Sequence, residues 1–165
     1  MIDWYPWIVV IHVVAAFAFI LSHGVSAFVA FQLRRERRPD HVATLIGLSS
    51  NSLSAMYPAL LVLLVAGVVG GFVGDWWGQA WIWLSIGLLV AVAIAMYLVG
   101  TRYYIAVRHA VGLSAPQDGK REDALVPATP DELDALLTSR RPELLALIGG
   151  GGLAAIIWLM EVKPF

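Results

Sequence analysis

Two histidines lie in a long apolar segment near the start of the chain, and they are the residues best suited to chemistry. Apart from Tyr5, His12 and His23 are the only ionisable side chains between Asp3 and Arg34. A helix turns about 100° per residue, so a spacing of eleven residues returns almost to the same side. That side also carries small residues and one phenylalanine: Ala15, Ala16, Phe19, Ser22, Ser26, Ala27 and Ala30. Small side chains mark helix contacts in membranes, so we expect both imidazoles to face other helices.

The separation of the two imidazoles limits the kind of site that they can form. Eleven residues place their Cα atoms about 16 Å apart along a helix, too far to share one metal ion. Each histidine would therefore belong to its own site, at its own depth. Haem and copper both accept imidazole, and each normally takes a second protein ligand.

Two methionines are candidates for that second ligand. Met96 is expected at about the depth of His23, whereas Met160 lies near the outer end of the last apolar segment, somewhat shallower than His12. A His/Met pair can hold haem, and a thioether with an imidazole also suits Cu(I). The candidate ligands for haem b or copper are therefore His12, His23 and Met96, with Met160 as a further metal ligand.

The same histidines have simpler explanations. An imidazole between helices can hydrogen-bond a serine hydroxyl or a backbone carbonyl of its neighbour. Proton handling is a third explanation, but no Asp, Glu or Lys lies in the interior of an apolar segment to extend a relay. No catalytic residue is predicted, and enzymatic activity stays open.

The composition indicates a membrane protein. The chain has 165 residues, of which 59% are hydrophobic and 14% charged, and its mean hydropathy is +0.77. Soluble domains average about 25% charged residues. The chain has no cysteine, which excludes disulfides, thiolate-held zinc and cysteine-held iron–sulfur clusters.

Four apolar segments predict membrane-spanning helices, because about 20 residues cross a bilayer and a lipid-exposed backbone must bond internally. The expected spans are 7–33, 53–73, 80–104 and 144–162. They predict an all-α, polytopic membrane protein, with residues 1–165 forming a single four-helix bundle. The start MIDWYPW lacks a basic residue, so no cleaved signal peptide is expected.

The basic residues predict how the chain is oriented in the membrane. Arginines follow the first span and, with Lys120, lie between the third and fourth: Arg34, Arg35, Arg37, Arg38, Arg102, Arg108, Arg121, Arg140 and Arg141. This bias places the loops 34–52 and 105–143 in the cytoplasm and both termini outside. All seven tryptophans fall at the expected outer boundary. We therefore expect a multi-pass protein of the cytoplasmic (inner) membrane of a prokaryote.

The predicted loops contain further helix signals. Residues 40–54 are expected to extend the second helix into the cytoplasm. Thr129, Pro130 and Glu132 form a helix start, and Leu133, Leu136 and Leu137 follow as a narrow apolar stripe. A short helix on the inner membrane surface is the favoured interpretation, and a docking site for a soluble partner is the alternative.

Glycines predict close helix contacts. Gly67 with Gly71, and Gly70 with Gly74, form small-xxx-small repeats in the second span, and the run 149–152 lies in the fourth. These faces would pack within one bundle or between subunits. The expected partners are the lipid bilayer and either a second copy or another membrane protein, with no nucleic acid.

The first span, HVVAAFAFILSHG, resembles the first helix of small four-helix membrane proteins related to the copper-resistance D family and its uncharacterised relatives, and the ending WLMEVKPF is similar to some of the latter. The resemblance implies a polytopic inner-membrane protein with a copper or haem connection at His12. The chain departs from this pattern because its other spans contain no histidine. Two other families fit less well. Di-haem membrane cytochromes b carry histidines on several helices, and bacterial membrane protoporphyrinogen oxidase pairs its histidine with a lysine on a later helix.

Two functional hypotheses therefore stand side by side. The favoured one is a non-enzymatic membrane component or complex subunit that packs through its glycine-rich faces. The alternative is a haem b or copper protein for redox or metal handling, built on the histidines of the first span.

Overall fold

The computed structural model describes residues 4–115, 118 and 126–164. The described chain forms α1 (Tyr5–Leu33), α2 (Pro39–Val73), α3 (Ala80–Met96), the π-helical turn η1 (Tyr97–Thr101), α4 (Arg102–Ala110), α5 (Pro130–Leu137) and α6 (Arg141–Val162). Four stretches are long and apolar enough to cross a membrane: α1, α2, the segment Ala80–Ala110 and the segment Pro130–Val162. The predicted all-α fold with four apolar helices is confirmed to this extent.

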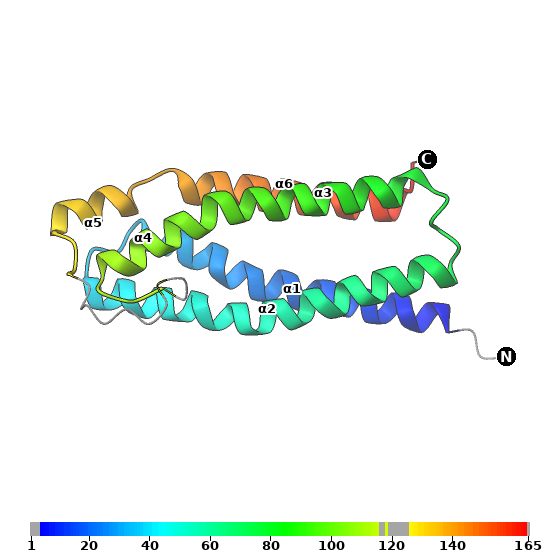
Figure 1. Cartoon of the computed structure of the whole chain (residues 1–165), viewed down its shortest axis with the longest axis horizontal. Helices are drawn as coiled ribbons and strands as arrows, with labels where there is room; N and C mark the ends of the chain where they lie inside the picture. The colour runs from blue at the N-terminus through cyan, green and yellow to red at the C-terminus, as the bar shows by residue number, and fades with distance from the viewer. Residues whose placement is uncertain (1–3, 116–117, 119–125, 165) are drawn as a thin grey trace.

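The helices form two antiparallel pairs, α1 with α2 and α3 with α6 (Figure 1). Both termini and the loop 74–79 lie at one end of the bundle, which we call the tryptophan end. The loop 34–38, the end of α4 and α5 lie at the opposite end, the arginine end. Lys120 and Arg121, which the sequence assigns to this second end, lie outside the described residues.

Prolines begin several of the helices. Pro6, Pro39, Pro130 and Pro142 occupy the first or second helical position, where the missing N–H would have no intrahelical partner. α2 starts at Pro39 and continues through Pro58 to Val73, so residues 40–54 do extend the second helix. At about 1.5 Å per residue, its 35 residues span about 52 Å, well beyond a hydrocarbon core of about 30 Å.

Large apolar side chains are exposed along most of the bundle and buried at the arginine end. Towards its middle and at the tryptophan end, large side chains point outward; Leu21 is 71% exposed, Phe72 71% and Leu147 72%. The main buried cluster lies at the arginine end and joins α1, α2, α4 and α5: Val29, Leu33, Val42, Ile46, Tyr103, Val107, Ala110, Leu133 and Leu137. Lipid is as apolar as leucine, so helices within it need no apolar core, whereas a part that projects into water does.

α5 confirms one prediction and corrects another. Thr129 and Glu132 form a reciprocal capping box at its start, as the sequence indicates. The apolar stripe, however, does not lie against a membrane surface. Leu133 and Leu137 are buried in the arginine-end cluster, and Leu136 packs against it. The stripe is narrow because its leucines pack into a protein core.

Glycines set the spacing between helices at several places within the chain. A Cβ at Gly67 would lie 3.0 Å from the His12 ring, and one at Gly70 would lie 3.4 Å from Ile8. A Cβ at Gly152 of α6 would lie 2.3 Å from Val92 of α3. These glycines therefore allow α2 to approach α1 and α6 to approach α3.

Ion pairs tie the loop 34–38 to the second half of the chain. Arg34 pairs with Glu143 of α6, and Arg37 pairs with Asp134 of α5. Glu36 accepts hydrogen bonds from the backbone N–H groups of Arg38 and Arg37 and bonds the ring of His41. These bonds lower the pKa of Glu36 to about 2. The turn between α1 and α2 is thus organised around a carboxylate that stays ionised in mild acid.

The contact at Gly152 predicts that alanine lowers the stability of the protein there but not at a glycine with free space around it. Gly152→Ala should destabilise the protein by about 1–3 kcal/mol, because Val92 cannot move aside without disturbing α3. Gly87→Ala is the matched control: nothing lies within 4 Å of its added Cβ, and alanine favours a helix over glycine by up to about 1 kcal/mol. Thermal unfolding in detergent measures both. Equal midpoints for the two variants would contradict the assigned packing.

Candidate functional site

His23 lies on α1 with one ring nitrogen enclosed by protein. Its imidazole stacks on Phe19, one helical turn earlier, with ring centroids 5.7 Å apart and planes 3° from parallel. Nδ1 is buried and has no hydrogen-bond partner among the described residues. A buried polar atom without a partner is uncommon in a native fold and marks a place where a ligand or water is expected.

Met96 is brought to the same place by α3 and α6. A Cβ at Gly149 of α6 would lie 3.6 Å from the Met96 sulfur and 3.7 Å from His23 Nε2. The other ring nitrogen of His23, Nε2 and not the unpartnered Nδ1, and the thioether of α3 therefore lie beside one point next to the backbone of α6. The structure places His23 and Met96 together, which sequence depth alone could only suggest.

The backbone at Met96 is unusual. Met96 ends α3 and is followed directly by the π-helical turn η1. Such turns are rare and occur often at functional sites, since the wider turn shifts the side chains beside it. Gly100 within η1 is buried against Leu145 of α6. The wider turn is thus held between helices beside the candidate ligand.

His12 is engaged differently. Its Nδ1–H donates a hydrogen bond to the backbone carbonyl of Leu63 at 3.0 Å, and its ring packs over Gly67. A carbonyl only accepts, so this bond assigns the proton to Nδ1. The imidazole joins α1 to α2, which is the simpler structural role considered from the sequence.

Met160 is half-buried near the tryptophan end of α6, and its predicted pairing with His12 stays a prediction. The ring of His12 contacts α2, at Leu63 and Gly67, whereas His23 lies beside Gly149 of α6. The two imidazoles thus face different helices despite sharing a side of α1.

A serine cluster near His23 was not predicted. The Ser26 hydroxyl bonds that of Ser52 at 2.9 Å and accepts from the Ser49 hydroxyl at 3.1 Å. The Tyr104 hydroxyl donates to the Ser26 carbonyl at 3.0 Å and so links α4 to α1. The run SSNSLS in the sequence was the available signal, since hydroxyls in apolar surroundings seek partners. The cluster fixes α1 three residues beyond His23.

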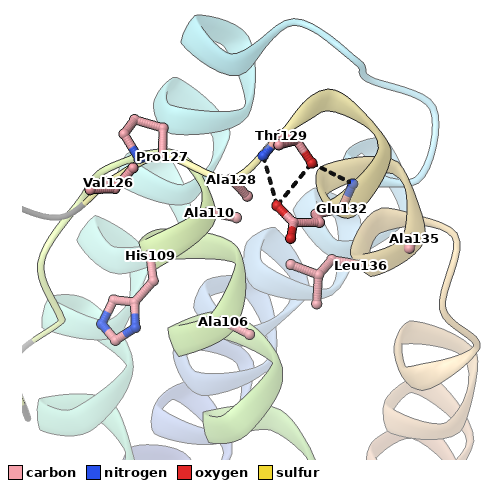
Figure 2. A pocket seen from close by; sticks show the side chains of 10 residues that line it. All are labelled: Ala106, His109, Ala110, Val126, Pro127, Ala128, Thr129, Glu132, Ala135 and Leu136. Carbon is pink, nitrogen blue, oxygen red and sulfur yellow. Dashed lines mark hydrogen bonds between the residues drawn. The ribbon is translucent and has the colours of Figure 1, made fainter.

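The other two histidines lie at the arginine end. His109 borders an open hollow lined by α4, α5 and residues 126–129, and its ring points away from the paired Thr129 and Glu132 (Figure 2). His109 Nε2 bonds the Asp118 carboxylate at 2.8 Å. This hollow is remote from His12 and His23. No group of three or more His, Cys, Asp or Glu side chains gathers around a metal-sized space in residues 4–115, 118 and 126–164.

Comparison of the chain with protein-family models, with curated proteins and with solved structures found no match. The resemblance to the copper-resistance D family therefore stays a prediction, and the candidate site rests on its own geometry.

Proposed function

We propose that this protein is a membrane-embedded metal-handling protein that binds Cu(I) between His23 and Met96. One observation supports this above the others: His23 Nε2 and the Met96 sulfur, from different helices, flank the same point at Gly149. Imidazole and thioether are ligands that copper accepts, and thioethers favour the Cu(I) state. Hard ions such as Mg²⁺ and Ca²⁺ prefer oxygen ligands, which this pair does not offer.

Residues around the pair position the two donor atoms. Phe19 holds the imidazole plane by stacking, and Gly149 leaves space beside both donor atoms. Apolar helix surfaces surround the pair, so a bound ion would be removed from water. A copper ion held there would supply a soft, redox-active centre.

Haem b fits the same pair less well. An axial His/Met pair holds iron from the two faces of a porphyrin. A Cβ at Gly149 would make ordinary van der Waals contact with both donors, so the backbone of α6 lies where a macrocycle would have to enter. A single ion needs far less room between the helices than a macrocycle.

Copper titration of the purified protein tests the proposal. The detergent-solubilised protein should bind one Cu(I) in competition with a colorimetric chelator. His23→Ala and Met96→Leu should each weaken binding at least about tenfold, which corresponds to ~1.4 kcal/mol.

Matched controls come from the same chain. His12→Leu removes the imidazole bonded to Leu63, and Met56→Leu removes a buried methionine of α2; both should leave the affinity unchanged. The proposal fails if the wild type binds no Cu(I), or if the His12 and His23 variants lose affinity equally.

We further propose that the arginine end faces the cytoplasm and both termini face outside, in a prokaryotic inner membrane. The arginines and the tryptophans occupy opposite ends of the bundle, as the positive-inside bias and aromatic belts require. The chain has no native cysteine, so single cysteines report sidedness directly. In intact cells, a membrane-impermeant thiol reagent should label Gly78→Cys, whereas Asp40→Cys should react only after permeabilisation. The reverse pattern would contradict this orientation.

A second candidate function is that of a subunit in a membrane complex. Gly150 and Gly151 of α6 have nothing within 4 Å of an added Cβ, so this part of the glycine run is not used within the chain. A neighbouring helix of another protein or of a second copy could pack there.

Self-association tests the version with a second copy. A Gly150→Leu, Gly151→Leu double variant should lose dimers detected by cross-linking in membranes. Gly87→Leu, at another open glycine on α3, should retain them. A monomeric wild type would refute this version.

A further inference from the structure

We propose a binding site for a phosphate group where α1, α4 and α6 meet at the arginine end. Arg34, Arg140 and Arg141 would provide its charge and Tyr103 a hydroxyl donor. A phosphate group can belong to an anionic phospholipid or to free phosphate. The site is separate from His23 and Met96 and does not depend on the copper proposal.

The arginines are brought together by the end of α1 and the start of α6. Arg34 ends α1 and pairs with Glu143 in the first turn of α6, so it lies beside Arg140 and Arg141. Glu143 interacts electrostatically with Arg140 as well as with Arg34. Three guanidinium groups against one carboxylate leave this junction with excess positive charge. Guanidinium groups match phosphate oxygens in geometry and charge.

The start of α6 adds to the same field. No side chain caps its first turn, so the N–H groups that follow Pro142 there have no side-chain cap. α6 is 22 residues long and carries a helix dipole. The positive end of this dipole is at the first turn, beside Arg34 and Arg141. Helix starts of this kind favour phosphate oxygens.

Tyr103 provides an independent observation. Its side chain is 1% exposed, and its hydroxyl has no hydrogen-bond partner among the described residues. Tyr103 packs in the same buried cluster as Leu33, the residue before Arg34, and Gly100, one helical turn before Tyr103, faces Leu145 of α6; these contacts place Tyr103 at the same junction. A buried hydroxyl without a partner next to two arginines is the arrangement expected where an anion completes the bonding.

The site lies where a lipid headgroup would reach it. The arginine end follows the apolar part of each helix pair, and apolar residues of α6 begin directly after Glu143. An anionic lipid could place its chains along α6 and its phosphate at Arg141. Anionic headgroups attract basic clusters beside a membrane helix.

The experiment measures thermal stability of the full chain in two settings. In vesicles, adding phosphatidylglycerol to phosphatidylcholine should raise the unfolding midpoint by roughly 5 °C or more. In neutral detergent, sodium phosphate is compared with sodium chloride at equal ionic strength. A rise in vesicles alone identifies the lipid source, and a rise in detergent identifies free phosphate.

The variants decide whether either rise comes from this site. Arg141→Gln and Tyr103→Phe should abolish it, whereas Arg141→Lys should retain part. Arg38→Gln, which removes one charge from the loop at the same end, should behave as the wild type. If no rise occurs in either setting, or if Arg38→Gln and Arg141→Gln reduce it equally, the site is refuted. A variant that fails to fold by circular dichroism is replaced by Arg140→Gln, to which the same criteria apply.

Discussion

The helices of this bundle approach one another most closely at glycines, and the contacts of both histidines follow from that approach. Within hydrocarbon, burying leucine against leucine gains little, so helices associate through tight packing and polar contacts. Gly67 lets the ring of His12 reach the backbone of α2, and Gly149 lets α6 lie beside both His23 and Met96. A larger side chain at either position would displace an imidazole. The glycines therefore determine which partner each histidine meets.

The two ends of the bundle are stabilised in different ways. The arginine end carries a buried apolar cluster, ion pairs and a capped helix, as a water-facing domain does. At the tryptophan end, Trp76 donates to the Tyr5 hydroxyl at 2.9 Å, and the Lys163 ammonium lies 4.4 Å from the centre of the Trp76 ring. Such an aromatic and cationic belt suits a headgroup layer. The candidate copper ligands lie between these ends, where the chain offers few other polar groups.

Much of the fold could be predicted from the sequence, because lipid imposes simple rules on length and hydropathy. The four apolar helices and the capping box at Thr129 and Glu132 are such features. Azimuth on α1 correctly indicated that the histidines contact other helices, but it could not say which ones. That depends on how α2 and α6 pack around α1, and so His12 bonds Leu63 while His23, like Met96, lies beside Gly149. Tertiary packing also determines the burial of Leu133 and Leu137 and the π-helical turn after Met96. Local sequence patterns do not contain that information.

If an imidazole of α1 and a thioether of α3 form one ligand pair, both will be seen by X-ray absorption at the copper edge, on protein loaded with one equivalent of Cu(I). The expected spectrum has one sulfur and at least one imidazole nitrogen bonded to copper, with the sulfur absent in Met96→Leu. A shell of nitrogen and oxygen alone in the wild type, or a sulfur signal that persists in Met96→Leu, would contradict it.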